Sequence, residues 1–332
     1  MDFLGILLSI FFGFVPMFIF AVIIYWMDRY EKEPKLLLIG VFIWGAVVAA
    51  GAAFIINSVF GVGVYIFTQS DAITEATTGI ISAPIVEEAL KGLAVLIVFL
   101  LFRKEFDSVM DGIAYAAVTA LGFAATENAF YIYSYGWAEG GVSGLLWLVF
   151  VRVILVGWQH PFYTAFTGIG LAYNRLSRNM LVKLGAPVIG FSIAMFTHAM
   201  HNTMATFLSG LGGLAVSTLV DWSGWIVMFL FILWAVSRER GWLITHLREE
   251  VALGVMTVPQ YRVACSAWAQ TSARTNAIFA GNYQVVSRFY QVCAELAFKK
   301  QQRATQGEEG GNSPIIDRLR AELASLSPRV RA

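Results

Sequence analysis

Long apolar stretches alternate with short polar connections over the first 240 residues of the chain. A helix needs about 20 apolar residues to cross ~30 Å of hydrocarbon, and most of these stretches reach that length. The pattern predicts seven membrane-spanning helices, at approximately 3–26, 36–60, 78–102, 109–133, 143–173, 184–208 and 222–238. The fifth is overlong, and Pro161 in its middle predicts a kink or a strong tilt. We therefore expect an all-α polytopic membrane protein.

Basic and non-basic connections alternate between these predicted spans. Lys and Arg occur in the connections 27–35, 103–108 and 174–183 and after residue 238, whereas 61–77, 134–142 and 209–221 contain neither. Because cytoplasmic loops carry an excess of Lys and Arg, we expect the N-terminus outside and the C-terminus in the cytoplasm. The pattern thus predicts a multi-pass protein of the cell (inner) membrane.

The sequence becomes more polar after residue 240, which predicts a second region outside the membrane. We expect a transmembrane helical bundle with an intramembrane active site at 1–240 and a cytoplasmic region of amphipathic helices at 241–304. A flexible linker at 305–314 and a short C-terminal helix and tail at 315–332 should follow.

The composition supports a membrane protein and argues against other classes. Of 332 residues, 58% are hydrophobic and 14% are charged, and the mean hydropathy is +0.68. Soluble domains carry about 25% charged residues. A net charge of +1 without a long basic run gives no indication of nucleic-acid binding. Cys265 and Cys293 lack metal-ligand spacing, so we expect reduced structural thiols.

Polar side chains interrupt four of the predicted spans. They are Glu87, Glu88 and Lys91 on the third, Glu127 and Asn128 on the fourth, Arg152, Gln159 and His160 on the fifth, and His198, His201 and Asn202 on the sixth. Ionisable groups inside a bilayer are costly and usually functional. At ~1.5 Å per residue, their estimated depths allow one shared site in the outer half of the membrane. In an alternative, purely structural reading, Lys91 neutralises one of the two adjacent glutamates as a helix pair, although it cannot neutralise both.

Small residues at intervals of four predict which helix faces pack together. Gly112, Ala116, Ala120 and Ala124 lead to Asn128 on the fourth span, and Gly190 and Ala194 lead to His198 and Asn202 on the sixth. Such ridges let helices approach closely in lipid, so these polar residues should face the interior of the bundle. Glu87 and Glu88 point about 100° apart, so only one should be aimed squarely at the histidines. His201 faces about 60° away from His198, and we expect it to be structural.

Glutamates and histidines at similar depth indicate hydrolysis. One glutamate with two imidazoles is a ligand set for zinc, and a further glutamate can act as general base to a bound water. Without metal, a Glu and His pair could activate water directly. No serine with a nearby base stands out as a nucleophile. A proton-coupled transporter or a non-catalytic scaffold could carry the same polar residues, although the internal symmetry that a transporter predicts is not apparent.

Four motifs follow one another on successive predicted spans. They are Glu87-Glu88-Ala-Leu-Lys91, then Asp111-Gly-Ile-Ala-Tyr with Leu121-Gly-Phe-Ala-Ala-Thr-Glu127-Asn128, then His160 followed by Thr164, and finally His198-Ala-Met-His-Asn202. Over about residues 30–240 the chain resembles PrsW-type intramembrane metalloproteases, which are similar to the CAAX-prenyl-protease and bacteriocin-processing superfamily. The resemblance implies a glutamate-dependent and metal-dependent protease that cuts a membrane protein or a lipidated peptide within the lipid bilayer.

The resemblance also implies roles for the matching residues. Glu87 would be the water-activating base with His160 as its partner, and His198 with Asn202 would hold metal, water or the developing oxyanion. The expected catalytic residues are Glu87, Glu88, His160, His198 and Asn202, the expected ligands of a divalent metal, zinc, are Glu88, His160 and His198, and the expected supporting residues are Lys91, Glu127 and Asn128. Which of the two adjacent glutamates is the base, and whether a metal is needed, stay open at this point. The motifs give His201 no role.

Overall fold

The structure is a computed structural model that describes residues 3–308 and 311–331, and in this part of the chain every regular element is helical. The α-helices are α1 (Phe3–Met27), α2 (Lys35–Ile43), α3 (Ala50–Thr68), α4 (Asp71–Thr77), α5 (Ala83–Leu101), α6 (Val109–Tyr131), α7 (Ala138–Val149), α8 (Gln159–Leu176), α9 (Met180–Phe207), α10 (Gly210–Ala252), α11 (Val258–Ala264), α12 (Ala267–Phe279), α13 (Tyr283–Gln306) and α14 (Asn312–Leu326). The π-helical turns are η1 (Trp44–Ala49), η2 (Thr78–Ser82), η4 (Ile132–Trp137) and η5 (Phe150–Leu155), and the 3-10 turns are η3 (Arg103–Glu105) and η6 (Ser327–Arg329). The predicted all-α class is confirmed.

Five helical stretches among the described residues are long and apolar enough to cross a membrane. They are Phe3–Met27, Lys35–Thr68, Val109–Leu176, Met180–Phe207 and Gly210–Ala252. The chain is therefore a multi-pass membrane protein. The sequence predicted seven spans because it counted α5, which contains three charged residues, and divided Val109–Leu176 into two. The number of crossings and the orientation of the termini stay predictions.

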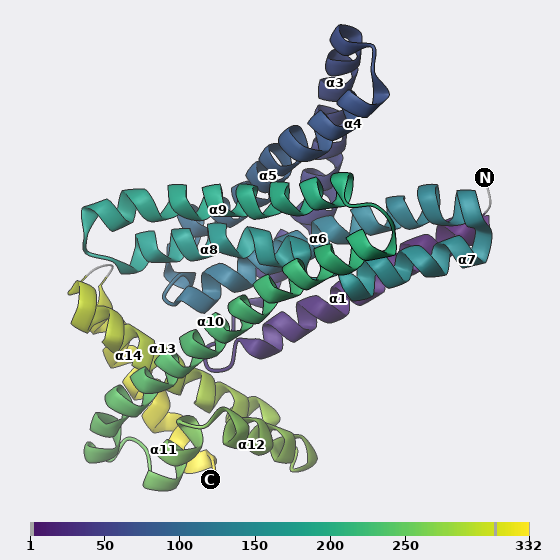
Figure 1. The fold of residues 1–332 in the computed structure, drawn as a ribbon. Coiled ribbons are helices and arrows are strands. Elements are labelled where there is room, and N and C mark those ends of the chain that lie inside the picture. Colours follow the sequence, from purple (N-terminus) through teal and green to yellow (C-terminus); the bar gives the residue numbers. More distant parts are fainter. Residues whose placement is uncertain (1–2, 309–310, 332) are drawn as a thin grey trace. The chain divides into compact units, whose positions relative to one another are not determined.

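The stretch Val109–Leu176 is not one straight helix. Gly141 has φ 58° and ψ −140°, a conformation that favours glycine. A Cβ on Gly144 would lie 2.3 Å from the carbonyl oxygen of Gly136, so the chain reverses sharply at Gly141, near the start of α7 (Figure 1). The helix is interrupted again after η5, where Val156 has φ −123°. Pro161 consequently lies in the first turn of α8, where its missing N–H removes no helical hydrogen bond, and not in the middle of a helix as predicted.

Two compact units make up the chain. The first runs to Met27 and includes 33–175 and 179–230, and the second contains 28–32, 176–178 and the chain from Phe231 on. In the first unit α6 is the central helix, because every residue from Val109 to Ala125 is buried and α1, α2 and α5 pack against it. The domain divisions predicted at 240, 304 and 314 stay predictions.

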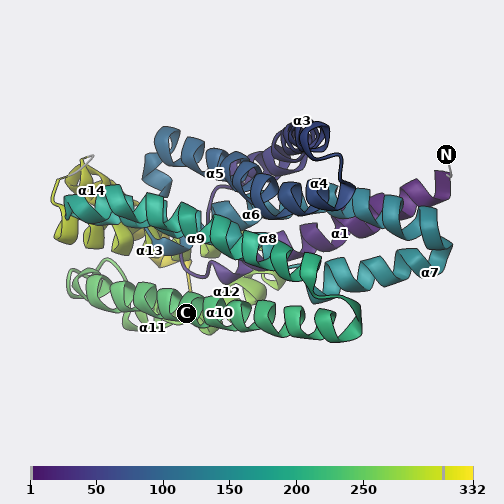
Figure 2. The same ribbon diagram turned by 45° about the horizontal axis from the view of Figure 1, so that its top comes forward.

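Glycines allow close helix contacts inside the first unit. A Cβ on Gly112 of α6 would lie 2.3 Å from the carbonyl oxygen of Gly168 of α8, and a Cβ on Gly190 of α9 would lie 2.3 Å from the carbonyl oxygen of Phe166 of α8. Both predicted small-residue ridges therefore contact a neighbouring helix, and in each case that helix is α8. The two views show α8 and α9 side by side (Figure 1, Figure 2).

The second unit has its own hydrophobic core. Its members that are at most 2% exposed include Leu243 and Leu247 of α10, Phe289, Tyr290 and Leu296 of α13, and Ile316, Leu319 and Leu323 of α14. Cys265 and Cys293 are buried free thiols in the same core. Burial raises the pKa of the Cys293 thiol. Both cysteines thus lie in a hydrophobic core, where a structural thiol belongs, and their reduced state stays a prediction.

Candidate active site

A polar cavity of about 310 Å³ lies within the first unit. The polar residues that line it include Glu87 of α5, Glu127 and Asn128 of α6, Arg152 of η5, Gln159, His160 and Tyr163 of α8, and His198, His201 and Asn202 of α9. The four predicted spans that carry intramembrane polar residues all contribute. Of the expected catalytic residues, Glu88 is the one that does not line the cavity.

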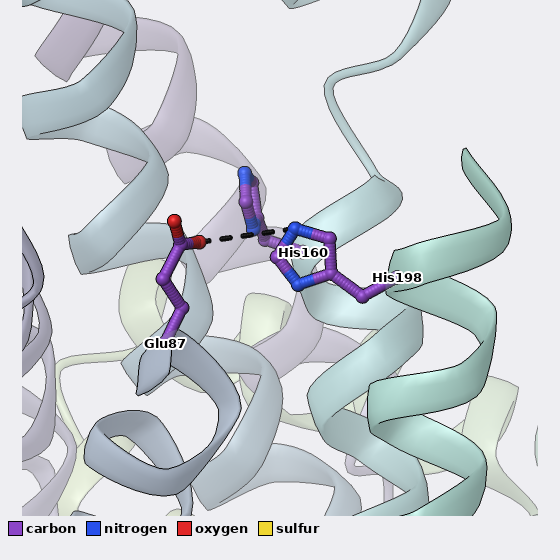
Figure 3. A group of neighbouring side chains, drawn as sticks. All are labelled: Glu87, His160 and His198. Atoms are coloured by element: carbon purple, nitrogen blue, oxygen red, sulfur yellow. Dashed lines mark ion pairs between the residues drawn. The ribbon is translucent and has the colours of Figure 1, made fainter. Parts of the chain in front are cut away.

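Three side chains from three helices form a cluster at the cavity wall. Glu87, His160 and His198 each offer a ligand atom, and these atoms lie within 4.8 Å of one another (Figure 3). Oε2 of Glu87 is 3.8 Å from Nε2 of His198, and the two imidazole rings are 5.3 Å apart. Oε2 of Glu87 is buried and has no hydrogen-bond partner in the described part of the chain. Because a buried polar atom without a partner is costly, this oxygen is available for water, substrate or metal.

Glu88, the next residue along α5, has partners on both carboxylate oxygens. Its Oε1 is 2.5 Å from Nζ of Lys91 and 3.0 Å from Nδ1 of His198, and its Oε2 accepts a hydrogen bond of 2.8 Å from Oγ1 of Thr164. The sequence predicted that only one glutamate would be aimed at the histidines. Instead, Glu88 and Glu87 approach the two ring nitrogens of the same His198.

His198 is held in one tautomer and one plane. Since the Glu88 carboxylate accepts a hydrogen bond, Nδ1 of His198 carries the proton and Nε2 presents its lone pair to Glu87. Tyr163 stacks on the imidazole with ring centres 4.7 Å apart. A carboxylate that orients an imidazole in this way is the usual outer partner of a metal-binding histidine.

His160 has a partner at each nitrogen. Nζ of Lys91 lies 3.2 Å from Nδ1, and Oε2 of Glu127 lies 2.8 Å from Nε2. An ammonium can only donate, so Nδ1 accepts from Lys91 and Nε2 donates to Glu127. Arg152 donates from Nη2 to the same Glu127 oxygen at 2.5 Å and from Nε to Oδ1 of Asn128 at 2.8 Å. The three expected supporting residues therefore form one hydrogen-bond network with Arg152 around His160.

Asn202 and His201 have separate partners. Nδ2 of Asn202 donates at 2.7 Å to the carbonyl oxygen of Gly79, which lies in the π-helical turn η2 just before α5. Such turns are frequent at functional sites. Nδ1 of His201 is 2.9 Å from Oδ2 of Asp221 and 3.1 Å from Nε2 of Gln159. His201 lines the cavity but does not belong to the Glu87 cluster.

Two residues at the site have contacts that the sequence did not predict. Asp221 was expected in a connection at 209–221, but α10 begins at Gly210 and buries Asp221. The sequence analysis placed this stretch between two predicted spans, and no pattern indicated the partner of Asp221. Arg152 had a visible signal, because an arginine inside an apolar run indicates function. Its partners Glu127 and Asn128 could not be inferred, because they lie on a different helix, α6, and no local pattern encodes a contact between helices.

The cluster of Glu87, His160 and His198 fits a divalent metal such as zinc. One carboxylate and two imidazoles are ligand types that zinc prefers, and three protein ligands leave a position for water. Glu87 offers an unpartnered oxygen and His198 offers a lone pair, whereas His160 would exchange one of its two hydrogen bonds for the metal. The carboxylate of this cluster is Glu87, whereas the sequence suggested Glu88 as a ligand, and the assignment of metal ligands stays a prediction.

Comparisons with a family model and with curated proteins all match one protein family. Residues 33–236 match the family described as PrsW family intramembrane metalloprotease. Protease PrsW of Geobacillus kaustophilus (strain HTA426) is 31% identical over 112 residues, which are 34% of this chain and 46% of that protein. Protease PrsW of Clostridioides difficile (strain 630) is 35% identical over 108 residues, which are 32% of this chain and 43% of that protein. Protease PrsW of Shouchella clausii (strain KSM-K16) is 28% identical over 204 residues, which are 58% of this chain and 86% of that protein.

The matched segments cover less than half of the length of the first two relatives. No solved structure matches the chain. The family match extends over more than half of the chain and contains every residue that lines the cavity. The chain therefore belongs to the PrsW family of intramembrane metalloproteases.

Proposed function

We propose that this protein is an intramembrane endopeptidase that hydrolyses a peptide bond in a membrane-embedded or membrane-anchored protein. The observation that carries the proposal is the unpartnered carboxylate oxygen of Glu87, buried beside two imidazoles in a polar cavity. Hydrolysis inside a bilayer requires a chamber for water. A cavity of about 310 Å³ has room for several water molecules, since each occupies ~30 Å³ in the liquid.

In this proposal Glu87 is the general base. Oε2 of Glu87 and Nε2 of His198 are 3.8 Å apart, so one water molecule can hydrogen-bond to both atoms. Glu87 accepts a proton from the water as the water oxygen attacks the carbonyl carbon of the substrate. The same proton then passes to the departing amine, which leaves an acid and an amine as products.

The family description implies a metal ion, and the cluster fits one. With a metal bound, Glu87 would be a ligand together with His160 and His198, and the ion would take over the activation of water from Glu87 by lowering the pKa of the bound water to about 7. The other residues of the chain orient this set. Glu88 holds the tautomer of His198, and Lys91 donates to His160 and pairs with Glu88. The two histidines are thereby connected through one buried ion pair.

The test uses the full-length protein in proteoliposomes with a pool of single-span membrane proteins, and new peptide termini are identified by mass spectrometry. Glu87→Gln keeps the size of the side chain but removes the base, so we expect cleavage to fall by about 10³-fold. Glu139→Gln removes an exposed carboxylate of α7 and should leave cleavage unchanged. Metal analysis of the purified protein should find a divalent ion in the wild type and less in His198→Ala.

Two results would contradict the proposal. Wild-type cleavage by Glu87→Gln would exclude Glu87 as the base. Uptake of a solute by proteoliposomes, with no new peptide termini in any pool, would indicate a transporter that uses the same buried glutamate and histidines.

A further inference from the structure

Arg152 is a charged side chain of the cavity for which the reaction described above has no use. It belongs to the π-helical turn η5 and lines the cavity, with 19% of its side chain exposed. An ionised arginine within an apolar segment is costly and usually marks a functional site. The pairing with Glu127 compensates its charge, but it does not explain why an arginine is needed at this position.

The guanidinium of Arg152 is held on one edge. Nη2 donates to Oε2 of Glu127 at 2.5 Å and Nε donates to Oδ1 of Asn128 at 2.8 Å. The guanidinium carbon also lies 4.2 Å from the ring centre of Tyr131. A planar guanidinium fixed by two neighbouring acceptors and an aromatic face has little rotational freedom. Arg152 is therefore pre-oriented without any substrate present.

The other edge of the guanidinium is unused. A guanidinium has five N–H donors, and Nη1 makes no hydrogen bond to any residue that the structure describes. The buried side-chain atoms without a partner in the described residues do not include Nη1. Since Nη1 has no partner there, it is not fully buried. Since Arg152 lines the cavity, the open donor can reach a group bound there.

Arg152 is also close to the Glu87 cluster. Oε2 of Glu127 accepts from both Nη2 of Arg152 and Nε2 of His160, so a single carboxylate oxygen separates the guanidinium from a member of the cluster. Asn202, which the sequence suggested as a group for the developing oxyanion, already donates from Nδ2 to the carbonyl oxygen of Gly79. Arg152 has an uncommitted N–H group and a positive charge, and both favour an anionic oxygen.

We propose that Arg152 is a further catalytic residue, whose Nη1 donates to the oxygen of the peptide carbonyl under attack. The inference rests on the proposed peptidase function. When the water oxygen bonds to the carbonyl carbon, the π electrons move to the carbonyl oxygen, and Nη1 stabilises the negative charge that forms there. The C=O bond then reforms, the C–N bond breaks, and the amine leaves with the proton that Glu87 accepted. Hydrogen-bond donors that are already in place stabilise such charge at low reorganisation cost.

The test compares Arg152→Lys with the wild type, using a reporter made from a single-span protein that the wild type cleaves. Lysine keeps the positive charge beside Glu127 but cannot hold Asn128 and present a second N–H edge at the same time. We expect kcat to fall by about 10²-fold or more, as when other oxyanion donors are removed, while KM changes less than about threefold. Arg175→Lys is the matched control, because Arg175 is a buried arginine of α8 that does not line the cavity. It should keep the wild-type kcat.

A second variant separates catalysis from folding. In Arg152→Ala, millimolar guanidinium ion should restore part of the lost kcat by entering the vacated space, at concentrations far below those that unfold proteins. A kcat of Arg152→Lys within about threefold of wild type would overturn the inference. Loss of activity together with a lowered Tm and no rescue by guanidinium would also overturn it, because Arg152 would then be structural. Failure of the peptidase function itself would appear differently, as absence of Glu87-dependent cleavage in the wild type.

Discussion

Each unit of the molecule contains a pair of adjacent glutamates, and the two pairs are neutralised to different extents. In the second unit, Lys300 contacts Glu249 at 2.6 Å and Glu250 at 2.7 Å, and Arg320 binds both oxygens of Glu250 at 2.8 and 2.9 Å. In the first unit, Lys91 pairs with Glu88 at 2.5 Å. Oε2 of Glu87 has no hydrogen-bond partner among the described residues.

The difference separates structural charges from reactive ones. Two cations satisfy the second pair, so these carboxylates hold α10, α13 and α14 together and have little capacity left for chemistry. A single lysine satisfies Glu88 but leaves Glu87 facing a polar cavity beside two imidazoles. An incompletely neutralised buried carboxylate is costly for folding and useful as a base. The following predictions test this contrast in order of expected effect.

The largest difference should appear in catalysis. Glu87→Gln is expected to lower the cleavage rate by about 10³-fold, because it removes the proton acceptor. Glu250→Gln should change the rate less than about threefold, since Glu250 belongs to the second unit and has no part in the cavity. Initial rates with the reporter protein in proteoliposomes measure both. Equal losses in the two variants would contradict the assignment of chemistry to the first pair.

The two buried lysines should differ in what they support. Lys91→Met leaves Glu88 with no cation, so we expect a loss of about 3–5 kcal/mol in unfolding free energy together with loss of activity through the unanchored His160. Lys300→Met should cost less stability, because Arg320 still neutralises Glu250, and it should leave activity intact. Denaturant unfolding in detergent and the cleavage assay give the two quantities. Full activity in folded Lys91→Met would refute the proposed role of the buried ion pair.

The two glutamate variants should also differ in stability. This difference should be smaller than their difference in activity, and here Glu250→Gln should be the more affected variant. Glu87→Gln replaces an incompletely paired buried carboxylate by a neutral amide, so the unfolding free energy should stay equal or rise by about 1 kcal/mol. Glu250→Gln removes the partner of two cations and should lower it by about 3 kcal/mol. Thermal unfolding of the two purified variants measures this difference. A lower Tm for Glu87→Gln than for Glu250→Gln would reverse the comparison.

The smallest effect concerns the thiols of the second unit. Burial raises the pKa of the Cys293 thiol, and the thiolate is the reactive form, so Cys293 should react with maleimide far more slowly than a free thiol at neutral pH. Mass spectrometry after brief labelling of the folded protein measures the reaction, and labelling in denaturant provides the control. Rapid labelling of the folded protein would show that the core of the second unit opens readily.

Many features of the membrane unit could be predicted because they leave local signals. Apolar runs of sufficient length predicted the ends of α1 and α6 to within two residues and those of α9 to within four, and small residues at intervals of four predicted the faces that contact α8. Charged residues inside the apolar runs identified cavity residues, because a charge in an apolar helix is costly and usually has a function. The same method was wrong about 209–221, which it placed in a connection between two spans, whereas α10 begins at Gly210. It also placed the irregularity at Pro161, but the helix breaks at Val156.

The sequence by itself determined that this is a helical membrane protein and which helices carry carboxylates and imidazoles, because helix formation and membrane burial depend on residues within a few turns of one another. Lys91 could have paired with either adjacent glutamate by spacing alone. Only the tertiary structure assigned Lys91 to Glu88 and left Glu87 open. The physical reason is that Glu88 also binds Thr164 and His198, which lie 76 and 110 positions further along the chain. Contacts at such separations are decided by helix packing, and no local pattern encodes them.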